Sequence, residues 1–212
     1  MVRTVSTFVA VLTIAACGGS PLVQATTVSS VAVQPSDLPN GMHRCDQSGD
    51  IDTYLNFIKT KDPSTYATTK TQWDAAKKNG AIAAQVVFYA DTAANCASMA
   101  SDVSSMITAT YKVVVDYVIQ FKDEGTAAKG YTSGGIFGID ASKLKAGGSP
   151  VTEGTKTGLG ANSTVLSQKV GNQAFYIAVW QSKAYMVVLG IINLDSGVGQ
   201  KVADGEFKRI QQ

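Results

Sequence analysis

Residues 111–121 read YKVVVDYVIQF, and this alternation most constrains what the chain can fold into. Every second residue from Tyr111 to Phe121 is large and apolar, while the intervening set includes Lys112 and Asp116. A period of two indicates a β-strand whose two faces meet different surroundings. Such alternation is typical of an antiparallel sheet with one covered face, because strands of a parallel sheet are buried on both sides. The sequence therefore predicts an antiparallel sheet with one face in the core.

Other segments show strand or helix periodicity in turn along the chain. Asp50, Asp62, Asp91 and Asp123 stand where helices begin, since a short acidic side chain caps the free amides of a first turn. The predicted helices span 51–59, 63–78, 92–107, 124–131 and 198–210, the further strands span 42–45, 81–90, 163–170, 173–181 and 184–194, and a glycine-rich loop spans 134–160. This order predicts an α+β fold, an antiparallel sheet covered by helices, with repeated strand-helix units and a C-terminal hairpin plus helix.

Composition sets limits on partners and chemistry. The chain has 212 residues, of which 45% are hydrophobic, so a single domain can bury a core. Its 18 Lys and Arg nearly balance 16 Asp and Glu, a formal charge of +2 that gives no basic surface for nucleic acid. His43 is the single histidine, which excludes a multi-histidine metal centre and disfavours histidine-dependent catalysis. We therefore predict no nucleic-acid partner, no metal and no cofactor.

The N-terminus has the layout of an export signal. Arg3 precedes an apolar run that is too short to span a bilayer as a permanent helix, so residues 1–16 are predicted to be a lipoprotein signal peptide. The sequence Ile14-Ala15-Ala16-Cys17 resembles a bacterial lipobox. That resemblance implies that Cys17 becomes the lipidated N-terminus, since its thiol can form the thioether to diacylglycerol. The alternative is an ordinary signal peptide that contains a cysteine.

The lipobox, if used, determines the domain plan and the location. Residues 17–37 are then a lipidated cysteine and a flexible tether, because residues 18–37 are rich in Ser, Thr, Val and Gly and carry no charge before Asp37. Residues 38–212 are expected to form a single α+β domain. Two or three acyl chains give stable anchoring. We expect a lipid-anchored protein of the cell membrane or outer membrane that faces the extracytoplasmic side.

Two further cysteines remain once Cys17 is lipidated. In an exported domain, Cys45 and Cys96 are candidates for a disulfide bond, because export leads to an oxidising compartment. The alternative is two separately buried free thiols. A zinc site is disfavoured by the spacing and by the lack of a second histidine.

Three short motifs follow one another in the second half of the chain. They are Gly158-Leu159-Gly160, then Ala178-Val179-Trp180-Gln181, and finally Lys208-Arg209-Ile210. With the strand, acidic cap and Ala-rich helix before them, they make residues 38–212 resemble PsbP-like domains and the sensor domains of bacterial receptor kinases. The resemblance implies α/β layers around an antiparallel sheet and a role in sensing a ligand or partner. It brings no catalytic motif.

Aromatic residues are the candidate ligand-binding residues. Six aromatics could line an apolar pocket between the sheet and its helices, and four of them, Trp73, Tyr117, Tyr176 and Trp180, are the predicted site residues; the other two are Phe175 and Tyr185. The alternative is that they form the core, since large aromatics at strand positions are commonly buried. Along the strand, Tyr176, Ala178 and Trp180 point to one face. The residues of the other face are apolar too, namely Phe175, Ile177 and Val179. This pattern predicts a strand buried on both sides.

The sequence is consistent with three functions. The first is a membrane-tethered, non-catalytic binding or sensing module for an unknown small molecule. The alternative is an envelope structural or assembly protein that acts through a protein partner, and the third is a hydrolase of unrecognised type. A cavity of several hundred Å³ would favour the first, an exposed apolar patch the second, and convergent polar groups in a cleft the third. No residue is predicted to be catalytic.

Overall fold

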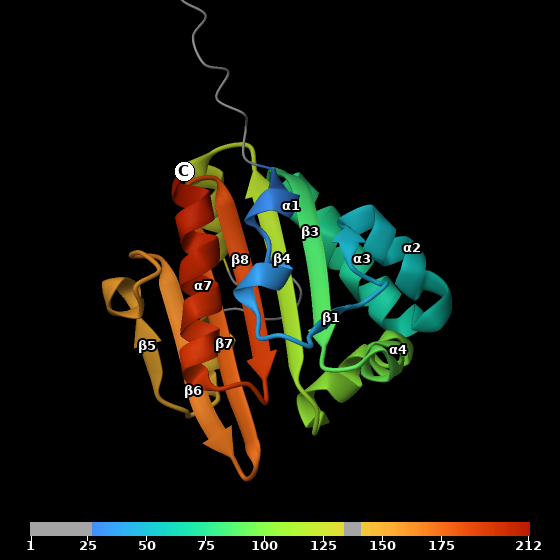
Figure 1. The fold of residues 1–212 in the computed structure, drawn as a ribbon. Helices are drawn as coiled ribbons and strands as arrows, with labels where there is room; N and C mark the ends of the chain where they lie inside the picture. The colour runs from blue at the N-terminus through green and yellow to red at the C-terminus, as the bar shows by residue number, and fades with distance from the viewer. Residues whose placement is uncertain (1–26, 134–140) are drawn as a thin grey trace, which may run out of the picture.

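The computed structural model describes residues 27–133 and 141–212. Within these residues, eight strands form one antiparallel sheet with helices on both faces (Figure 1). The strand order is β1-β3-β4-β8-β7-β6-β5, and β2 also pairs with β3. The α+β class predicted from the sequence is confirmed.

Hairpins connect the last strands of the sheet. The turn between β6 and β7 contains Gly171 with φ 59°, and the turn between β7 and β8 contains Lys183 with φ 48°. Both turns are at the predicted positions. The strands are β1 (His43–Arg44), β2 (Gly49–Asp50), β3 (Ala81–Ala90), β4 (Val113–Phe121), β5 (Val151–Glu153), β6 (Ser163–Val170), β7 (Gln173–Ser182) and β8 (Tyr185–Ile192).

The helices follow their capping signals closely. Asp50, Asp62 and Asp123 cap α2, α3 and α5, each accepting a hydrogen bond from the backbone amide three residues later. The α-helices are α1 (Val28–Val31), α2 (Ile51–Lys61), α3 (Pro63–Lys78), α4 (Ala93–Ser101), α5 (Glu124–Thr132), α6 (Ala141–Ala146) and α7 (Ser196–Gln211). The 3-10 helices are η1 (Pro35–Asp37), η2 (Val103–Thr108) and η3 (Gly154–Thr157).

Two sequence expectations about these elements need correction. The helix predicted over 92–107 ends at Ser101, and its cap is Thr92. Asp91 instead accepts hydrogen bonds from the Asn95 side chain at 2.7 Å and the Lys112 amide at 3.2 Å, so its carboxylate joins α4 to the start of β4. The stretch predicted as a glycine-rich loop contains α6, β5 and η3 in its described part.

The sheet carries an apolar core on each face, so the prediction of a single covered face was wrong. Helices α2 to α6 contribute to one core, which includes Tyr54, Phe88 and Tyr117. Helix α7 and the N-terminal segment cover the other face and lie in front of the sheet in Figure 1. The misleading signal was Asp116, which suggested a solvent-facing side of β4 but is 0% exposed, as is Val118 on the same face.

The expectation of a flexible tether through residue 37 was wrong for residues 27–37. Val31 and Val33 in this segment are buried, because they pack on the α7 side of the sheet. A composition low in charge suits a linker and a packed apolar segment equally well, which is why sequence did not separate the two. The folded domain therefore includes residues from 27 onward. The predicted signal peptide and Cys17 lie outside the described residues.

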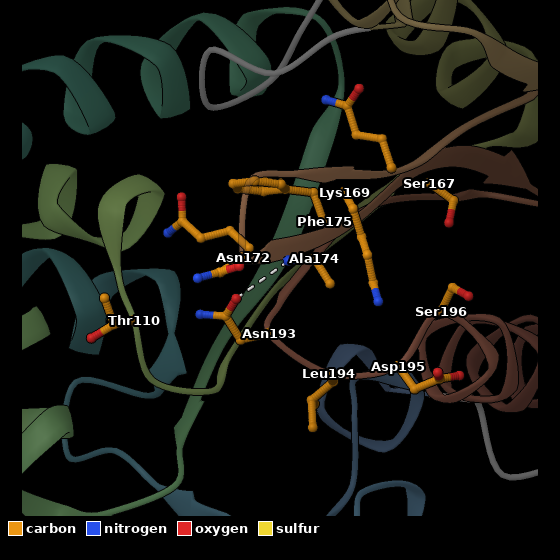
Figure 2. A pocket seen from close by; sticks show the side chains of 12 residues that line it. Thr110, Ser167, Lys169, Asn172, Ala174, Phe175, Asn193, Leu194, Asp195 and Ser196 are labelled. Atoms are coloured by element: carbon orange, nitrogen blue, oxygen red, sulfur yellow. Dashed lines mark hydrogen bonds between the residues drawn. The ribbon is translucent and has the colours of Figure 1, made fainter.

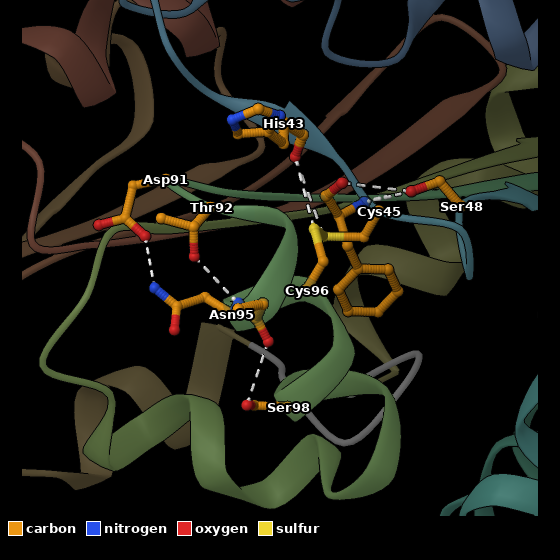
Figure 3. Close-up of a disulfide and its surroundings, with 10 residues drawn as sticks. His43, Cys45, Ser48, Asp91, Thr92, Asn95, Cys96 and Ser98 are labelled. Atoms are coloured by element: carbon orange, nitrogen blue, oxygen red, sulfur yellow. Dashed lines mark hydrogen bonds between the residues drawn. A yellow bond between two sulfur atoms is a disulfide. The ribbon is translucent and has the colours of Figure 1, made fainter.

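A disulfide joins Cys45 and Cys96, as predicted (Figure 3). Their Cα atoms are 5.2 Å apart, within the usual range for a disulfide. Cys45 follows β1, and its amide donates to the Phe88 carbonyl at 2.9 Å, while Cys96 lies in α4. The bond thus ties α4 to the β1 edge of the sheet across a separation of 51 residues.

Candidate functional site

An apolar cavity of about 540 Å³ lies over the central strands, on the face covered by α3, η2 and α6. A volume in this range suits a small-molecule ligand. Strands β4, β8 and β7 form its floor, and the helices form its walls. The floor residues are Val115, Tyr117, Phe175, Ile177, Val188, Gly190 and Ile192.

Gly190 creates the hollow in this floor. It pairs with Val115 of β4 and with Ile177 of β7, and Val188 and Ile192 flank it on the same face of β8. A Cβ atom added at Gly190 would come no nearer than 4.0 Å to another atom, the carbonyl oxygen of Val115. The missing side chain therefore leaves open volume at the centre of a ring of apolar residues.

The wall formed by α3 is polar where the floor is apolar. One face of this helix presents hydroxyl and amide side chains to the cavity, namely those of Ser64, Thr65, Thr68, Thr69 and Gln72. These positions share a helical face because their spacing follows the helix period. A helix that simply sealed a sheet would present large apolar side chains there. The cavity thus has an apolar side, formed by the sheet, and a polar side, formed by α3.

Two short elements complete the walls. Leu144 of α6 is buried in the core on this face, and the exposed Lys143 beside it also lines the cavity. Met106 and Ile107 of η2 form another part, and Ile107 is 68% exposed. A large exposed apolar side chain at a cavity mouth favours contact with an apolar ligand or partner.

The ionisable groups of the lining are Tyr117 and Lys143. Burial raises the pKa of the Tyr117 phenol well above its ordinary value, so this group is neutral at physiological pH. Its ring packs against Tyr54 and Phe88, each with ring centroids 6.3 Å away. The described lining thus combines a neutral phenol and a lysine side chain with the hydroxyl groups of α3 and the apolar floor.

The structure separates the four predicted ligand-binding aromatics. Tyr117 lines the cavity, and Trp73 lies in the same core but outside the lining. Tyr176 and Trp180 are on the opposite face, in the core under α7, where Trp180 is 0% exposed. The four side chains therefore do not meet in one pocket. The prediction that β7 is buried on both sides is confirmed around Trp180.

Sequence reasoning missed the residues that shape the cavity. It placed Phe175 and Ile177 on the other side of β7 from Tyr176, which is correct, and it considered Phe175 for a pocket, but it gave Ile177 no role. Gly190 was the available signal, because an isolated glycine within an apolar strand indicates a bulge or a site of close approach. The polar face of α3 was a second signal.

A second, polar cavity of about 540 Å³ lies where β7 begins and β8 ends (Figure 2). Two polar residues of its lining hold the chain in place. Asn193 donates to the carbonyls of Ala109 and Tyr111 at 2.7 and 3.0 Å, and accepts from the Ala174 amide at 3.3 Å. Asp195 caps α7. These contacts give Asn193 and Asp195 a structural role, and the apolar cavity is the better candidate site because its floor has the hollow at Gly190.

The described residues contain neither a membrane-spanning helix nor a cluster of metal-binding side chains. No helix in the part of the chain that the structure covers is long and apolar enough to cross a membrane. Across residues 27–133 and 141–212, no group of three or more His, Cys, Asp or Glu side chains is arranged to hold a metal ion.

Comparison with known proteins gives a similarity in structure but no match to a family model or a curated protein. Among solved structures, the chain is similar to the extracellular domain of PknH from Mycobacterium tuberculosis. The two share 12% identity with a TM-score of 0.48, and the match covers 87% of this chain and 95% of that chain.

Replacing Trp180 with alanine tests whether this residue serves the core or a binding site. Because Trp180 is fully buried under α7, Trp180→Ala should lower the free energy of unfolding by about 3–5 kcal/mol. Urea unfolding measures this loss, and Trp180→Phe, which keeps an aromatic ring, should lose less. Binding of the neutral fluorophore N-phenyl-1-naphthylamine should persist, since the cavity is on the other face. A stable Trp180→Ala protein that no longer binds the fluorophore would contradict this assignment.

Proposed function

We propose that this protein is a membrane-tethered extracytoplasmic lipoprotein whose domain binds an apolar or amphipathic small molecule and does not transform it. The observation that carries the proposal is the cavity over β4, β8 and β7, with Gly190 at its centre. Well-packed cores contain few voids larger than a water molecule, so a hollow of this volume indicates a ligand site.

The lining supports binding rather than catalysis. The sheet side offers aliphatic and aromatic surface from residues such as Phe175 and Ile192, and the α3 side offers hydroxyl groups. A ligand with an apolar body and one polar edge would satisfy both. The disulfide supports an oxidising compartment outside the cytoplasm, because such bonds form and persist there.

The competing proposal is an envelope assembly protein that docks a partner. Ile107 favours this alternative, since its exposed side chain at the cavity mouth could insert into another protein. The two proposals differ in what occupies the cavity. A free small molecule is needed only in the first.

Filling the cavity from its floor is the direct test. Gly190→Leu should place a side chain in open space without a backbone clash, and it replaces a poor strand former with a better one. Binding of N-phenyl-1-naphthylamine should weaken at least tenfold, while the midpoint of thermal unfolding stays the same or rises. Gly190→Ala is the matched control, with a smaller loss of binding because it adds a single methyl group.

Mass spectrometry of the intact protein purified from its own envelope gives the second readout. A co-purifying small molecule that is lost in Gly190→Leu would support the ligand proposal. Unchanged fluorophore binding in Gly190→Leu, together with no co-purifying molecule, would overturn it and favour the assembly protein.

Replacing Cys17 tests the tether. Cys17→Ala removes the thiol that would carry diacylglycerol, and with it the acyl chains whose burial contributes about 0.8 kcal/mol per CH₂. The protein should then move from the membrane fraction to the soluble extracytoplasmic fraction. If Cys17→Ala stays in the membrane fraction as the unmodified sequence does, the anchor lies elsewhere.

A further inference from the structure

Residues 27–38 form a strap on the α7 side of the sheet (Figure 1). Val31, Ala32 and Val33 in this strap are at most 2% exposed, and Leu38 is 8% exposed. They pack in the same core as the inward face of α7. The strap is thus the cover for the part of this sheet face that α7 does not reach.

Arg209 of α7 holds the strap through its guanidinium group. Its Nε donates to the Val31 carbonyl at 2.9 Å, and its Nη2 donates to the Ala32 carbonyl at 3.2 Å. It also forms a two-point ion pair with Asp37, with N–O distances of 3.1 and 2.8 Å. Asp37 already neutralises the charge of Arg209. The guanidinium group therefore does not fully neutralise a further carboxylate nearby.

Asp116 holds the strap from the sheet, and Glu206 lies against Asp116. One carboxyl oxygen of Asp116 accepts a hydrogen bond from the Val33 amide at 2.9 Å. The other oxygen of Asp116 and both oxygens of Glu206 are buried and lack a hydrogen-bond donor while both groups are ionised. Both residues are 0% exposed. Two carboxylates cannot both remain charged in such a place without a large cost, but one proton on Glu206 supplies a donor to Asp116.

The charged and titratable groups around the pair come from three elements. Arg209 on α7 and Asp37 on η1 act on both carboxyl groups, and Tyr89 on β3 feels the charge of Asp116. The Tyr89 hydroxyl donates to the Val33 carbonyl at 3.2 Å. If all were ionised, three carboxylates would face one guanidinium. The surroundings thus favour the retention of a proton by the pair.

Burial raises the pKa of both carboxyl groups. It raises the pKa of Asp116 to about 7, although the Val33 amide opposes the shift. Burial and the neighbouring Asp116 carboxylate raise the pKa of Glu206 well above its ordinary value. A carboxyl group with a raised pKa stabilises the closed form at low pH and loses that contribution as pH rises.

We propose that Asp116 and Glu206 form a proton-binding site that keeps the strap closed, and that loss of the proton opens the strap while the rest of the domain stays folded. Opening removes Val33 from Asp116 and admits water to the ionised pair. It also uncovers the apolar β3–β4 surface around Val87, Tyr89 and Val114. Because residues 27–37 of the strap belong to the predicted tether, its opening would add them to the span between Cys17 and the domain.

Hydrogen exchange of the full folded chain tests this device. Protection factors of peptides from the strap and from β8 are compared between pH 5 and pH 7, each corrected for the intrinsic exchange rate at that pH. If opening releases one proton, the opening constant of the strap rises about tenfold per pH unit, or about 100-fold over the range. The β8 peptides should retain far higher protection at both pH values.

Three variants separate the proton site from ordinary packing. Glu206→Gln keeps the shape and can donate to Asp116, and Asp116→Asn keeps an acceptor for Val33, so both should flatten the pH dependence. Asp204→Asn is the matched control on the same helix, since Asp204 bonds to Gln200 at 2.8 Å instead, and it should keep the slope of the unmodified chain.

The following results would overturn the proposal. Strap protection could stay constant from pH 5 to pH 7, or it could fall only in step with β8, which indicates global unfolding. An unchanged slope in Glu206→Gln and Asp116→Asn would also remove the pair as its cause. A flattened slope in both variants, with the control unaffected, supports it.

Discussion

The central strands β4 and β8 pair along their length and are apolar on both sides, so each side of the sheet must be covered. Full burial of one Val, Leu or Ile side chain contributes about 1.5–3 kcal/mol. Strand β8 alone places Met186 and Val188 in one core and Val187 and Leu189 in the other. This double burial explains why helices α2 to α6 cover one face, while α7 and a short N-terminal strap cover the second.

Each face of the sheet has one position that departs from close apolar packing. On the face covered by α2 to α6, Gly190 leaves a hollow opposite Val115. On the strap side, Asp116 puts a carboxyl group into an apolar core, opposite Leu189. The two pairs are consecutive in the β4–β8 ladder, so the candidate ligand site and the buried acid pair lie back to back through the sheet. Departures from regular core packing in natural proteins tend to lie at functional sites. This agrees with a binding site on one face and a proton site on the other.

Local signals in the sequence predicted much of the fold. The helix at 63–78 and the strand at 81–90 have the predicted bounds, because proline, capping residues and a change of period mark them. The disulfide followed from the number of cysteines and the export signal. The polar residue in β4 misled the prediction of exposure, because Asp116 is buried with Glu206, a residue 90 positions away in the printed sequence.

The candidate site was less accessible to sequence reasoning. Alternation along β7 correctly separated Tyr176 from Ile177, but it could not say which helices cover each face. Trp73 and Trp180 therefore seemed to belong to one pocket, although they lie on opposite faces. A cavity is made by side chains that are absent, so Gly190 and the small polar side chains of α3 become informative only when the sheet and helix are placed together.

The most direct test of the central claim is the location of a bound apolar molecule by methyl NMR. N-phenyl-1-naphthylamine is titrated into the folded protein, and methyl shifts are followed on both faces of the sheet. The account predicts shifts at Val115, Val188 and Ile192, which line the cavity, and none at Val114 and Val118 beneath the strap. Shifts confined to the strap side, or no saturable shift at the cavity methyls, would contradict it.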